Sequence, residues 1–312
     1  THFTGVAIVA LLLVHSPNYW KWFLIGGTGY LLDRALRFYR MRTPSTITAA
    51  RVLPSSVTEL SIARPSGFEY RAGDFVFILI PALSGFEWHP FTISSPPERR
   101  DAFTLHIRTL GDFTSALHRV CKHWPEIARG VIEPTPDIRP RVARRLTACL
   151  GQVPVYLDGP HGAPANDIFQ SRVAVLIAAG IGVTPFASIL QSLMHRHRSG
   201  TLDGAGVQKV YFLWVNRDQQ AFEWFTELLA DLNREDTGGF FDIRLFLTDP
   251  PPGELPPLAQ RGRPDLDAEL ARITAAHGKD DLGVFFCGPA PLADALHARC
   301  RVLGLKFKEE HF

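Results

Sequence analysis

The stretch LIAAGIGVTPFASIL, residues 176–190, indicates the fold of this chain more clearly than any other. Its apolar beginning predicts a buried strand, Gly180 and Gly182 predict a tight turn, and the residues from Thr184 onward predict a helix. A helix start offers unpaired N–H groups to phosphate oxygens, and glycine lets the backbone approach them. The stretch therefore predicts a pyrophosphate-binding turn. The alternative is a strand-to-helix turn with a purely structural role.

Apolar strands and helical stretches alternate around this turn. We expect strands at Val153–Leu157, Val173–Ala178, Val210–Val215, Ile243–Leu247 and Leu282–Phe286. The alternation predicts a parallel α/β sheet with right-handed crossovers, which binds ligands beyond the carboxyl ends of its strands. Three strand ends are expected to meet in one crevice, with the residues Val183, Thr184, Pro185, Asn216, Arg217, Cys287, Gly288 and Pro289.

The pattern before residue 153 is different. From Ser45 onward the chain shows short strands broken by proline and glycine. Val57–Ile62 mixes β-branched and polar residues, and Phe75–Ile80 is an apolar run between Gly73 and Pro81. Short strands at this spacing, with no strong helical pattern among them, predict a small antiparallel barrel. A length of 312 residues has room for two such domains and one further element.

Short motifs follow one another along both halves of the chain. In order they are HPFTISS (89–95), LHIR (105–108), DGPHG (158–162), GIGVTP (180–185), WVNRDQ (214–219), FFCGP (285–289) and a final Phe312. This ordered set resembles the flavocytochrome NADPH oxidases, most closely their calcium-regulated branch. The resemblance extends over almost the whole chain. It implies a membrane enzyme that takes hydride from NADPH onto FAD and passes single electrons through two haems to dioxygen, which gives superoxide.

The expected barrel is similar to the flavin-binding barrel of ferredoxin-NADP reductases, with YRAGDFV (70–76) leading to the flavin site. An isoalloxazine ring needs a flat apolar floor and a hydrogen bond near N5, and its pyrophosphate needs cations or N–H groups. The resemblance assigns FAD to His89, Pro90, Phe91, Thr92, His106, Ile107, Arg108, Thr109, Gly111 and Thr114. Many flavin reductases have arginine where His89 stands, so the phosphate is expected to depend more on Arg108. The alternative for HPFTISS is a proline-containing strand edge.

The end of the strand Val210–Val215 decides the expected nucleotide. A carboxylate there favours the ribose 2′-hydroxyl of NADH, whereas a cation favours the 2′-phosphate of NADPH. Arg217 is the candidate cation, but Asp218 beside it leaves open which side chain faces the ribose. The resemblance adds Arg263 as a second NADPH contact, and an isolated surface arginine is the alternative.

Two residues are candidates for the catalytic centre itself. Cys287 is expected beside the nicotinamide as a small polarizable wall. It is not expected to be a nucleophile, because no His or Asp partner is apparent in the sequence. In reductases of this type a terminal aromatic ring stacks on the flavin where the nicotinamide must sit, which implies that role for Phe312. The alternative is that Phe312 is an apolar tail.

Composition excludes several other functions. The net charge of +2 gives no sign of a nucleic-acid partner. The cysteines Cys121, Cys149, Cys287 and Cys300 show neither C-x-x-C pairing nor iron–sulfur spacing, so a built-in ferredoxin domain is not expected. No calcium-binding loop pattern occurs, so any calcium-sensing regulatory domain is expected outside this chain.

The N-terminal region is expected to be an integral membrane segment. Phe3–Val14 is an apolar run, and Tyr19–Leu32 is apolar and aromatic apart from Lys21. Tryptophans stand at one edge of the second run, and Arg34, Arg37, Arg40 and Arg42 stand beyond the other. This asymmetry predicts that residues after about 43 are cytoplasmic. Because both runs are short, a buried soluble hairpin is the alternative. The resemblance implies the last two of six membrane helices, with the earlier ones missing from this chain.

His2 and His15 are the candidate haem ligands. Thirteen residues of helix rise about 20 Å, which matches the separation of two stacked haems. Thirteen steps of about 100° do not return to the same helix face, so a kink or bulge is required. The resemblance implies two b-type haems, each with a second histidine from an earlier helix. Without the resemblance, an interfacial or hydrogen-bonded histidine is the simpler interpretation.

A basic insert is expected between the two domains. Residues 117–152 carry Pro125, Pro134, Pro136 and Pro140 together with Arg139, Arg141, Arg144 and Arg145. We expect a solvated loop, and a docking site for an acidic regulatory domain or anionic lipid is the alternative. The expected division is a transmembrane segment over 1–43, an FAD-binding barrel over 44–152 and an NADPH-binding α/β domain over 153–312.

Two other enzymes share these modules. A transmembrane ferric-chelate reductase delivers its electrons to metal, and a soluble flavin reductase delivers them to a carrier protein. A non-enzymatic scaffold held by partner subunits is the third alternative. Dioxygen is the acceptor that the resemblance favours.

Overall fold

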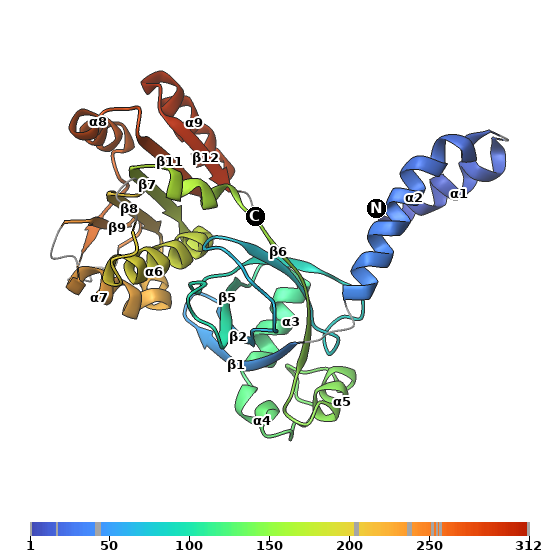
Figure 1. The fold of residues 1–312 in the computed structure, drawn as a ribbon. Coiled ribbons are helices and arrows are strands. Elements are labelled where there is room, and N and C mark those ends of the chain that lie inside the picture. The colour runs from blue at the N-terminus through green and yellow to red at the C-terminus, as the bar shows by residue number, and fades with distance from the viewer. Residues whose placement is uncertain are drawn as a thin grey trace.

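The fold was analysed in a computed structural model that describes residues 2–16, 18–40, 45–202, 206–235, 239–250, 253, 255 and 258–310. Two sheets form the body of the protein, and a hairpin of two helices projects from it (Figure 1). This is the expected ferredoxin-NADP reductase-like arrangement of an antiparallel sheet followed by a parallel α/β sheet.

The first sheet is antiparallel and has six strands in the order β4-β3-β6-β1-β2-β5. Its strands are β1 (Ser45–Leu53), β2 (Val57–Ala63), β3 (Phe75–Leu79), β4 (His89–Thr92), β5 (Ala102–Arg108) and β6 (Pro154–His161). An antiparallel bridge between Ile93 and Leu105 joins the end of β4 to β5. The two edges of the sheet therefore meet, and a buried cluster that includes Leu60, Val76 and Phe103 fills the space inside.

One expected strand belongs to a different sheet. The strand expected at Val153–Leu157 was assigned to the parallel sheet, and this assignment is wrong. The corresponding strand β6 pairs antiparallel with β1 and with β3. An apolar run alone does not reveal the direction of its partners, because strands in both sheet types are buried here. The chain enters the second sheet only after His161.

The second sheet is parallel, with six strands in the order β10-β9-β8-β7-β11-β12. Its strands are β7 (Val173–Ala179), β8 (Lys209–Asn216), β9 (Phe241–Leu247), β10 (Ala259–Arg261), β11 (Leu282–Cys287) and β12 (Lys306–Glu310). Its helices are α6 (Thr184–Arg198), α7 (Thr226–Glu235), α8 (Leu266–His277) and α9 (Ala290–Leu303), with 3₁₀ turns η1 (Pro164–Gln170), η2 (Gly180–Val183) and η3 (Gln219–Phe225).

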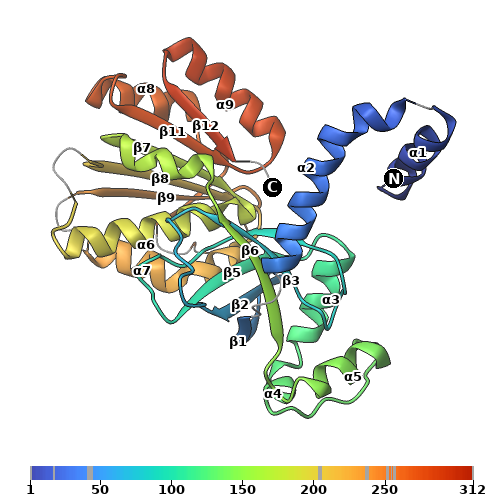
Figure 2. The same cartoon turned by 45° about the vertical axis from the view of Figure 1, so that its right-hand side comes forward.

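Helices cover both faces of this sheet. Side chains of a strand alternate between the two faces, so Leu176 packs in the cluster under α6 and α7, while Val175 and Ile177 pack under α8 and α9. Figure 2 shows the two helix pairs on opposite sides of the strands. This double cover explains the nearly continuous apolar strands of the sequence.

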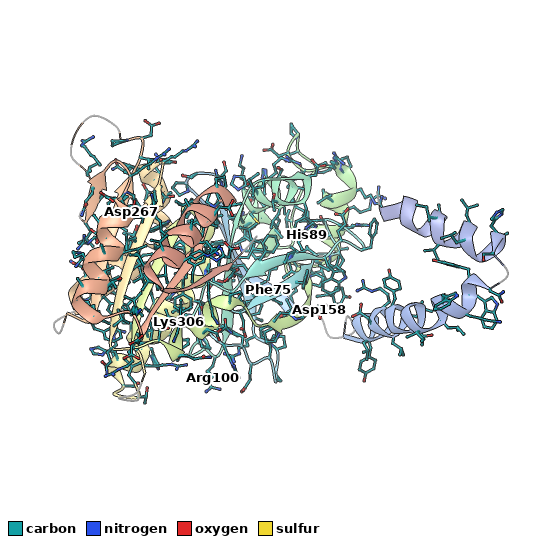
Figure 3. The ribbon with its side chains drawn as sticks, turned by 90° about the horizontal axis from the view of Figure 1, so that it is seen from above. Phe75, His89, Arg100, Asp158, Asp267 and Lys306 are labelled. Carbon is teal, nitrogen blue, oxygen red and sulfur yellow. The ribbon has the colours of Figure 1, made fainter. Side chains whose placement is uncertain are left out.

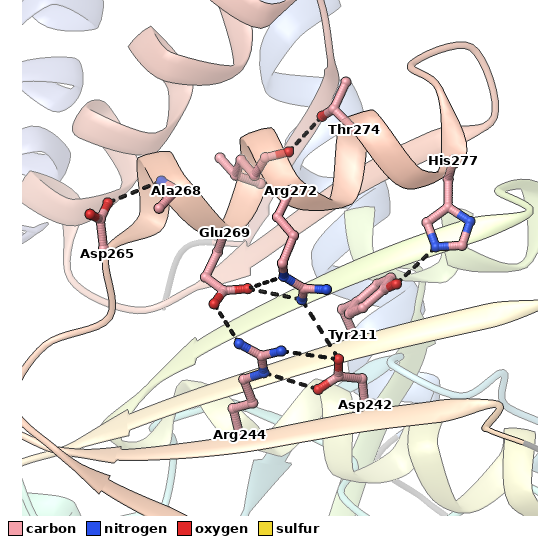
Figure 4. A network of polar contacts seen from close by, with 10 residues as sticks. Tyr211, Asp242, Arg244, Asp265, Ala268, Glu269, Arg272, Thr274 and His277 are labelled. Carbon is pink, nitrogen blue, oxygen red and sulfur yellow. Dashed lines mark hydrogen bonds and ion pairs between the residues drawn. The ribbon is translucent and has the colours of Figure 1, made fainter.

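A polar network fixes α8 to the outer strands (Figure 4). The Tyr211 hydroxyl lies 2.8 Å from His277 Nε2, and Arg272 lies over the Tyr211 ring at 5.3 Å. Arg244 of β9 donates to Asp242 at 3.0 Å and also pairs with Glu269 of α8. The network therefore joins β8, β9 and α8 on the face away from α6.

The basic insert is helical, so the expectation of a solvated loop is wrong. It contains the end of α3 (Asp112–Cys121), α4 (Trp124–Ala128) and α5 (Pro140–Ala148). Leu117, Ile127 and Leu146 are buried in the core of the first sheet. The many prolines misled the interpretation, because Pro125 and Pro140 stand at helix starts, where proline is tolerated.

The projecting hairpin consists of α1 (His2–His15) and α2 (Tyr19–Arg40). Many of its apolar side chains are exposed, among them Val14, Trp22 and Ile25. Within the described residues, no helix combines the length and the apolar character needed to cross a bilayer.

The insert provides a test of local packing. Gly151 has φ of 80°, and a Cβ there would lie 2.4 Å from the Ala128 carbonyl oxygen. Gly67 has φ of 77° with nothing within 4 Å of such a Cβ. We expect Gly67→Ala to cost about 1–2 kcal/mol through backbone strain alone. Gly151→Ala should cost about 1–3 kcal/mol more because of the clash. Thermal unfolding of both variants measures this, and equal melting temperatures would contradict it.

Candidate functional site

A cavity of about 340 Å³ opens where the antiparallel sheet meets the glycine turn η2. Residues expected at the flavin site line it: His89, Pro90, Phe91, Thr92, His106, Ile107, Arg108, Gly111 and Thr114. Ile181 and Thr184 close it from the nucleotide side. Figure 3 shows His89 between the helical hairpin and the parallel sheet that carries Lys306. The cavity is therefore shared between the two halves of the chain.

Two stacked rings form one wall of this cavity. The His89 and Phe113 rings stack with centroids 3.8 Å apart and an angle of 19° between their planes. Phe113 is buried on the first turn of α3, where the apolar face of the helix meets the barrel core. The sequence analysis missed Phe113, although it stands between two residues that it named. The stacked pair gives a flat, rigid surface.

The opposite end of the cavity carries a cation. Arg108 ends β5 with its side chain exposed, and its Nη1 would lie 3.8 Å from a Cβ built on Gly180. The start of α3 is less open to a phosphate than expected. Thr114 Oγ1 accepts the N–H groups of Leu110 at 2.9 Å and Gly111 at 3.0 Å. Arg108 is thus the main charge for an anion at this end.

His106 contributes shape rather than charge. Burial lowers its pKa to about 4, so the imidazole is neutral at physiological pH. Its Nδ1 lies 2.8 Å from Ser94 Oγ, and its ring lies 4.4 Å from the ring of Phe225 in the second half of the chain.

The second half of HPFTISS binds the other domain. Ser188 Oγ of α6 donates to the Ser95 carbonyl at 2.7 Å, and Gln191 Nε2 donates to the Ser94 carbonyl at 2.9 Å. The motif therefore divides by role: residues 89–92 line the cavity, and residues 94–95 fix the position of α6.

The glycines of the turn have packing reasons as well. A Cβ on Gly182 would lie 2.2 Å from the Cys287 carbonyl oxygen, and one on Gly288 would lie 2.8 Å from the Ala179 Cβ. Trp214 Nε1 donates to the Gly180 carbonyl at 3.0 Å. For Gly182 the close neighbour is thus the end of β11, a different reason from the approach to phosphate that the sequence suggested.

The expected nucleotide residues meet at one edge of the parallel sheet. Arg217 follows β8 and is exposed, and no hydrogen bond or ion pair of its guanidinium is found within the described residues. Thr248 N donates to the Asn216 carbonyl at 2.8 Å, and Gly262 N donates to the Leu247 carbonyl at 2.8 Å. The exposed Arg263 therefore lies at the same edge, two strands from Arg217.

Sequence analysis missed Glu310, which lies beside the cavity residue Thr92. Its carboxyl is 7% exposed, and Thr92 Oγ1 lies 3.4 Å from Oε1. Cys287 is its register partner across β11 and β12. Burial raises the pKa of Glu310 to about 8, and burial likewise raises the pKa of the Cys287 thiol well above its ordinary value. Both groups are therefore protonated at neutral pH, and the thiol is not a poised nucleophile. A charged residue in the short C-terminal strand gives no sequence signal of burial.

Several buried polar atoms around the cavity and crevice have no protein partner. Within the described residues these include His89 Nε2, Thr109 Oγ1, Asn216 Nδ2 and Glu310 Oε2. Such atoms are rare in folded proteins. Their positions fit a polar ligand that extends from the cavity to the sheet edge.

The haem and terminal residues are placed as follows. His15 ends α1 with an exposed side chain, and α1 begins at His2, whose side chain lies outside the described part of the chain. Phe312 also lies outside the described residues. Val183 and Pro185 are buried at the turn and the start of α6, and Pro289 precedes α9.

Comparisons with known proteins agree with this geometry. A family model described as an FAD-binding domain matches residues 43–165. One described as a ferric reductase NAD binding domain matches residues 171–253 and 259–301. A ferredoxin NADP+ reductase from Neisseria gonorrhoeae, solved with FAD and NADP, superposes with a TM-score of 0.58 at 17% identity. That match covers 86% of this chain and 97% of the other, and it shows the fold alone.

Curated relatives identify the family. Human NADPH oxidase 5 is 35% identical over 100% of this chain and 48% of its own length. Mouse NADPH oxidase 1 is 38% identical over 92% and 48%. In Dictyostelium discoideum, a superoxide-generating NADPH oxidase heavy chain is 31% identical over 95% and 60%. The chain thus spans about half the length of the curated relatives that it matches.

Fold and matched domains together define a reductase with one FAD-binding and one NAD(P)H-binding part. The chain belongs to the NADPH oxidase family and corresponds to the NADPH-to-FAD dehydrogenase portion of its members.

The raised pKa of Glu310 has a consequence for stability. Between the ordinary value of 4.5 and about 8, the unfolded chain releases this proton while the folded chain keeps it. Stability from this group is thus present at low pH and lost as pH rises, by up to about 1.4 kcal/mol per pH unit. We expect Glu310→Gln to match the native melting temperature near pH 5 and to exceed it near pH 8.5.

The control is Glu133→Gln, which removes an exposed carboxylate of the insert. Its melting temperature should follow that of the native chain across this range. A parallel pH dependence for the native protein and Glu310→Gln would show that Glu310 ionises normally.

Proposed function

We propose that this chain binds FAD in the shared cavity and NADPH at the carboxyl edge of the parallel sheet, and that it aligns them for hydride transfer. One observation carries the proposal: the same cavity is lined by β4, β5 and α3 and by residues Ile181 and Thr184 of the glycine turn. A flavin and a nicotinamide held by these two halves would meet at their boundary.

The residues of the cavity fit this ligand. The stacked His89 and Phe113 supply a flat wall, the buried Thr92 supplies a hydroxyl, and Arg108 supplies the cation. Bound FAD supplies the chemistry: it accepts hydride and releases electrons one at a time. Hydride transfer needs no general acid or base, so the protein contributes position and exclusion of water. The protonated Glu310 and Cys287 keep that region free of charge.

We further propose the roles of the remaining predicted residues. Arg217 binds the 2′-phosphate of NADPH with help from Arg263. Asn216, Gly288 and Pro289 line the crevice, Gly180 and Gly182 form the turn at the pyrophosphate, and Phe312 stacks on the flavin. The side-chain amide of Asn216, which is buried without a protein partner, supports a ligand at this edge.

For the whole protein we propose a membrane-bound superoxide-generating oxidase of the calcium-regulated branch, with residues after about 43 on the cytoplasmic side. Two b-type haems would carry single electrons to dioxygen, with His2 and His15 as ligands and further helices outside this chain as the source of their partners. The family assignment and the exposed apolar hairpin support this. Superoxide detected during NADPH oxidation by the full-length protein supports it, and exclusive reduction of ferric chelates would favour a ferric-chelate reductase instead.

Flavin retention tests the cavity. We expect Arg108→Ala to weaken FAD binding by about 10- to 150-fold, because hydrogen bonds to charged groups contribute about 1.5–3 kcal/mol. Titration of the apoprotein with FAD, followed by flavin fluorescence, measures the dissociation constant. Arg129→Ala is the control, since Arg129 is exposed on the insert, outside the cavity. Equal FAD affinity of both variants would place the phosphate elsewhere.

Nucleotide selectivity tests the sheet edge. We expect Arg217→Ala to weaken NADPH by about 10- to 150-fold and to leave NADH almost unchanged, because only NADPH carries the 2′-phosphate. Dissociation constants of both nucleotides are measured at constant FAD content. Sharing of the phosphate with Arg263 would reduce the effect, and the double variant detects this. An equal loss for NADPH and NADH would mean that Arg217 has a structural role.

A further inference from the structure

The turn between β1 and β2 reaches from the flavin sheet to the nucleotide edge. Its residues Pro54, Ser55 and Ser56 lie between the paired ends Leu53 and Val57. Val57 is fully buried, and it packs in the core of the parallel sheet rather than in its own. The Pro54 carbonyl accepts the Trp224 Nε1–H of η3 at 2.8 Å. The turn is therefore fixed against η3, directly after Arg217 and Asp218.

Both carboxylate oxygens of Asp218 are occupied by this arrangement. Oδ1 accepts the Gln220 N–H at 2.9 Å and so caps the start of η3. Oδ2 accepts the hydroxyl of Ser55. Asp218 is thus directed toward the flavin sheet, whereas its neighbour Arg217 is exposed.

We propose that Ser55 is a positioning residue for nucleotide selectivity: by holding Asp218 it keeps a carboxylate away from the ribose and leaves the site to Arg217. The proposal rests on the proposed NADPH site. A carboxylate that reaches the ribose accepts the 2′-hydroxyl of NADH and repels the 2′-phosphate of NADPH. The sequence presents both side chains after β8, and a residue from the other half of the chain, 163 positions away, decides between them.

Ser55→Ala tests this, and Ser56→Ala is its matched control. Both serines have positive φ, 58° and 57°, so alanine causes the same backbone strain at either position. Ser56 is exposed, and no side-chain hydrogen bond of it is found within the described residues. The probes are 2′,5′-ADP and 5′-AMP, whose binding to the FAD-loaded protein is measured by calorimetry without turnover.

We expect Ser55→Ala to reduce the preference for 2′,5′-ADP over 5′-AMP by about 3- to 10-fold, and Ser56→Ala to leave it unchanged. The double variant Ser55→Ala with Asp218→Asn should restore the preference, because asparagine still caps η3 but carries no charge. A merely structural loss would not be rescued. An unchanged preference in Ser55→Ala, or no recovery in the double variant, overturns the proposal.

The result is separable from that of the proposed function. If Arg217→Ala lowers both probes equally, the assignment of the 2′-phosphate to Arg217 fails. The Ser55 and Asp218 comparison still reports whether a released carboxylate changes the ratio of the two probes. If the native protein shows no preference for 2′,5′-ADP, the NADPH site itself fails, and a shift toward 5′-AMP in Ser55→Ala remains measurable.

Discussion

The site depends on the contact between α6 and the loop after β4. Ser188 and Ser192 are fully buried in this contact, and a buried hydroxyl is costly unless it is hydrogen-bonded. Ser188 donates to the Ser95 carbonyl at 2.7 Å, and Ser192 donates to Glu98 Oε1 at 2.8 Å. Only one relative position of the two sheets satisfies both. The glycine turn at the start of α6 is thereby fixed against the wall of the flavin cavity.

A second consequence is that charge is excluded from the centre of the site and kept at its two ends. His106 is neutral because burial lowers its pKa to about 4, and Glu310 is neutral near pH 7 because burial raises its pKa to about 8. The exposed Arg108 and Arg217 carry the positive charge at the ends. Such a distribution suits a ligand with phosphates at its ends and an uncharged reacting centre.

The sequence predicted the parts of this site that depend on local pattern. The order of strands β7, β8 and β11, the turn at Gly180 and the residues of HPFT all follow from periodicity, glycine chemistry and motif. What it missed depends on tertiary position. Glu310 belongs to a polar strand and becomes buried only because β12 is held against β11 and beside Thr92. The helices of the insert were missed because their apolar residues are sparse among prolines and arginines.

Asp218 shows most clearly why the remainder could not be predicted. From sequence alone, Arg217 and Asp218 are equivalent candidates for the ribose, because both follow the same buried strand. Their difference arises only when the β1–β2 turn arrives from the flavin sheet and Ser55 takes up one carboxylate oxygen. The turn is held there by the burial of Val57 in the other core and by the Trp224 hydrogen bond. Selectivity at one cofactor site thus depends on the packing of the domain that holds the other cofactor, a coupling that only the assembled fold contains.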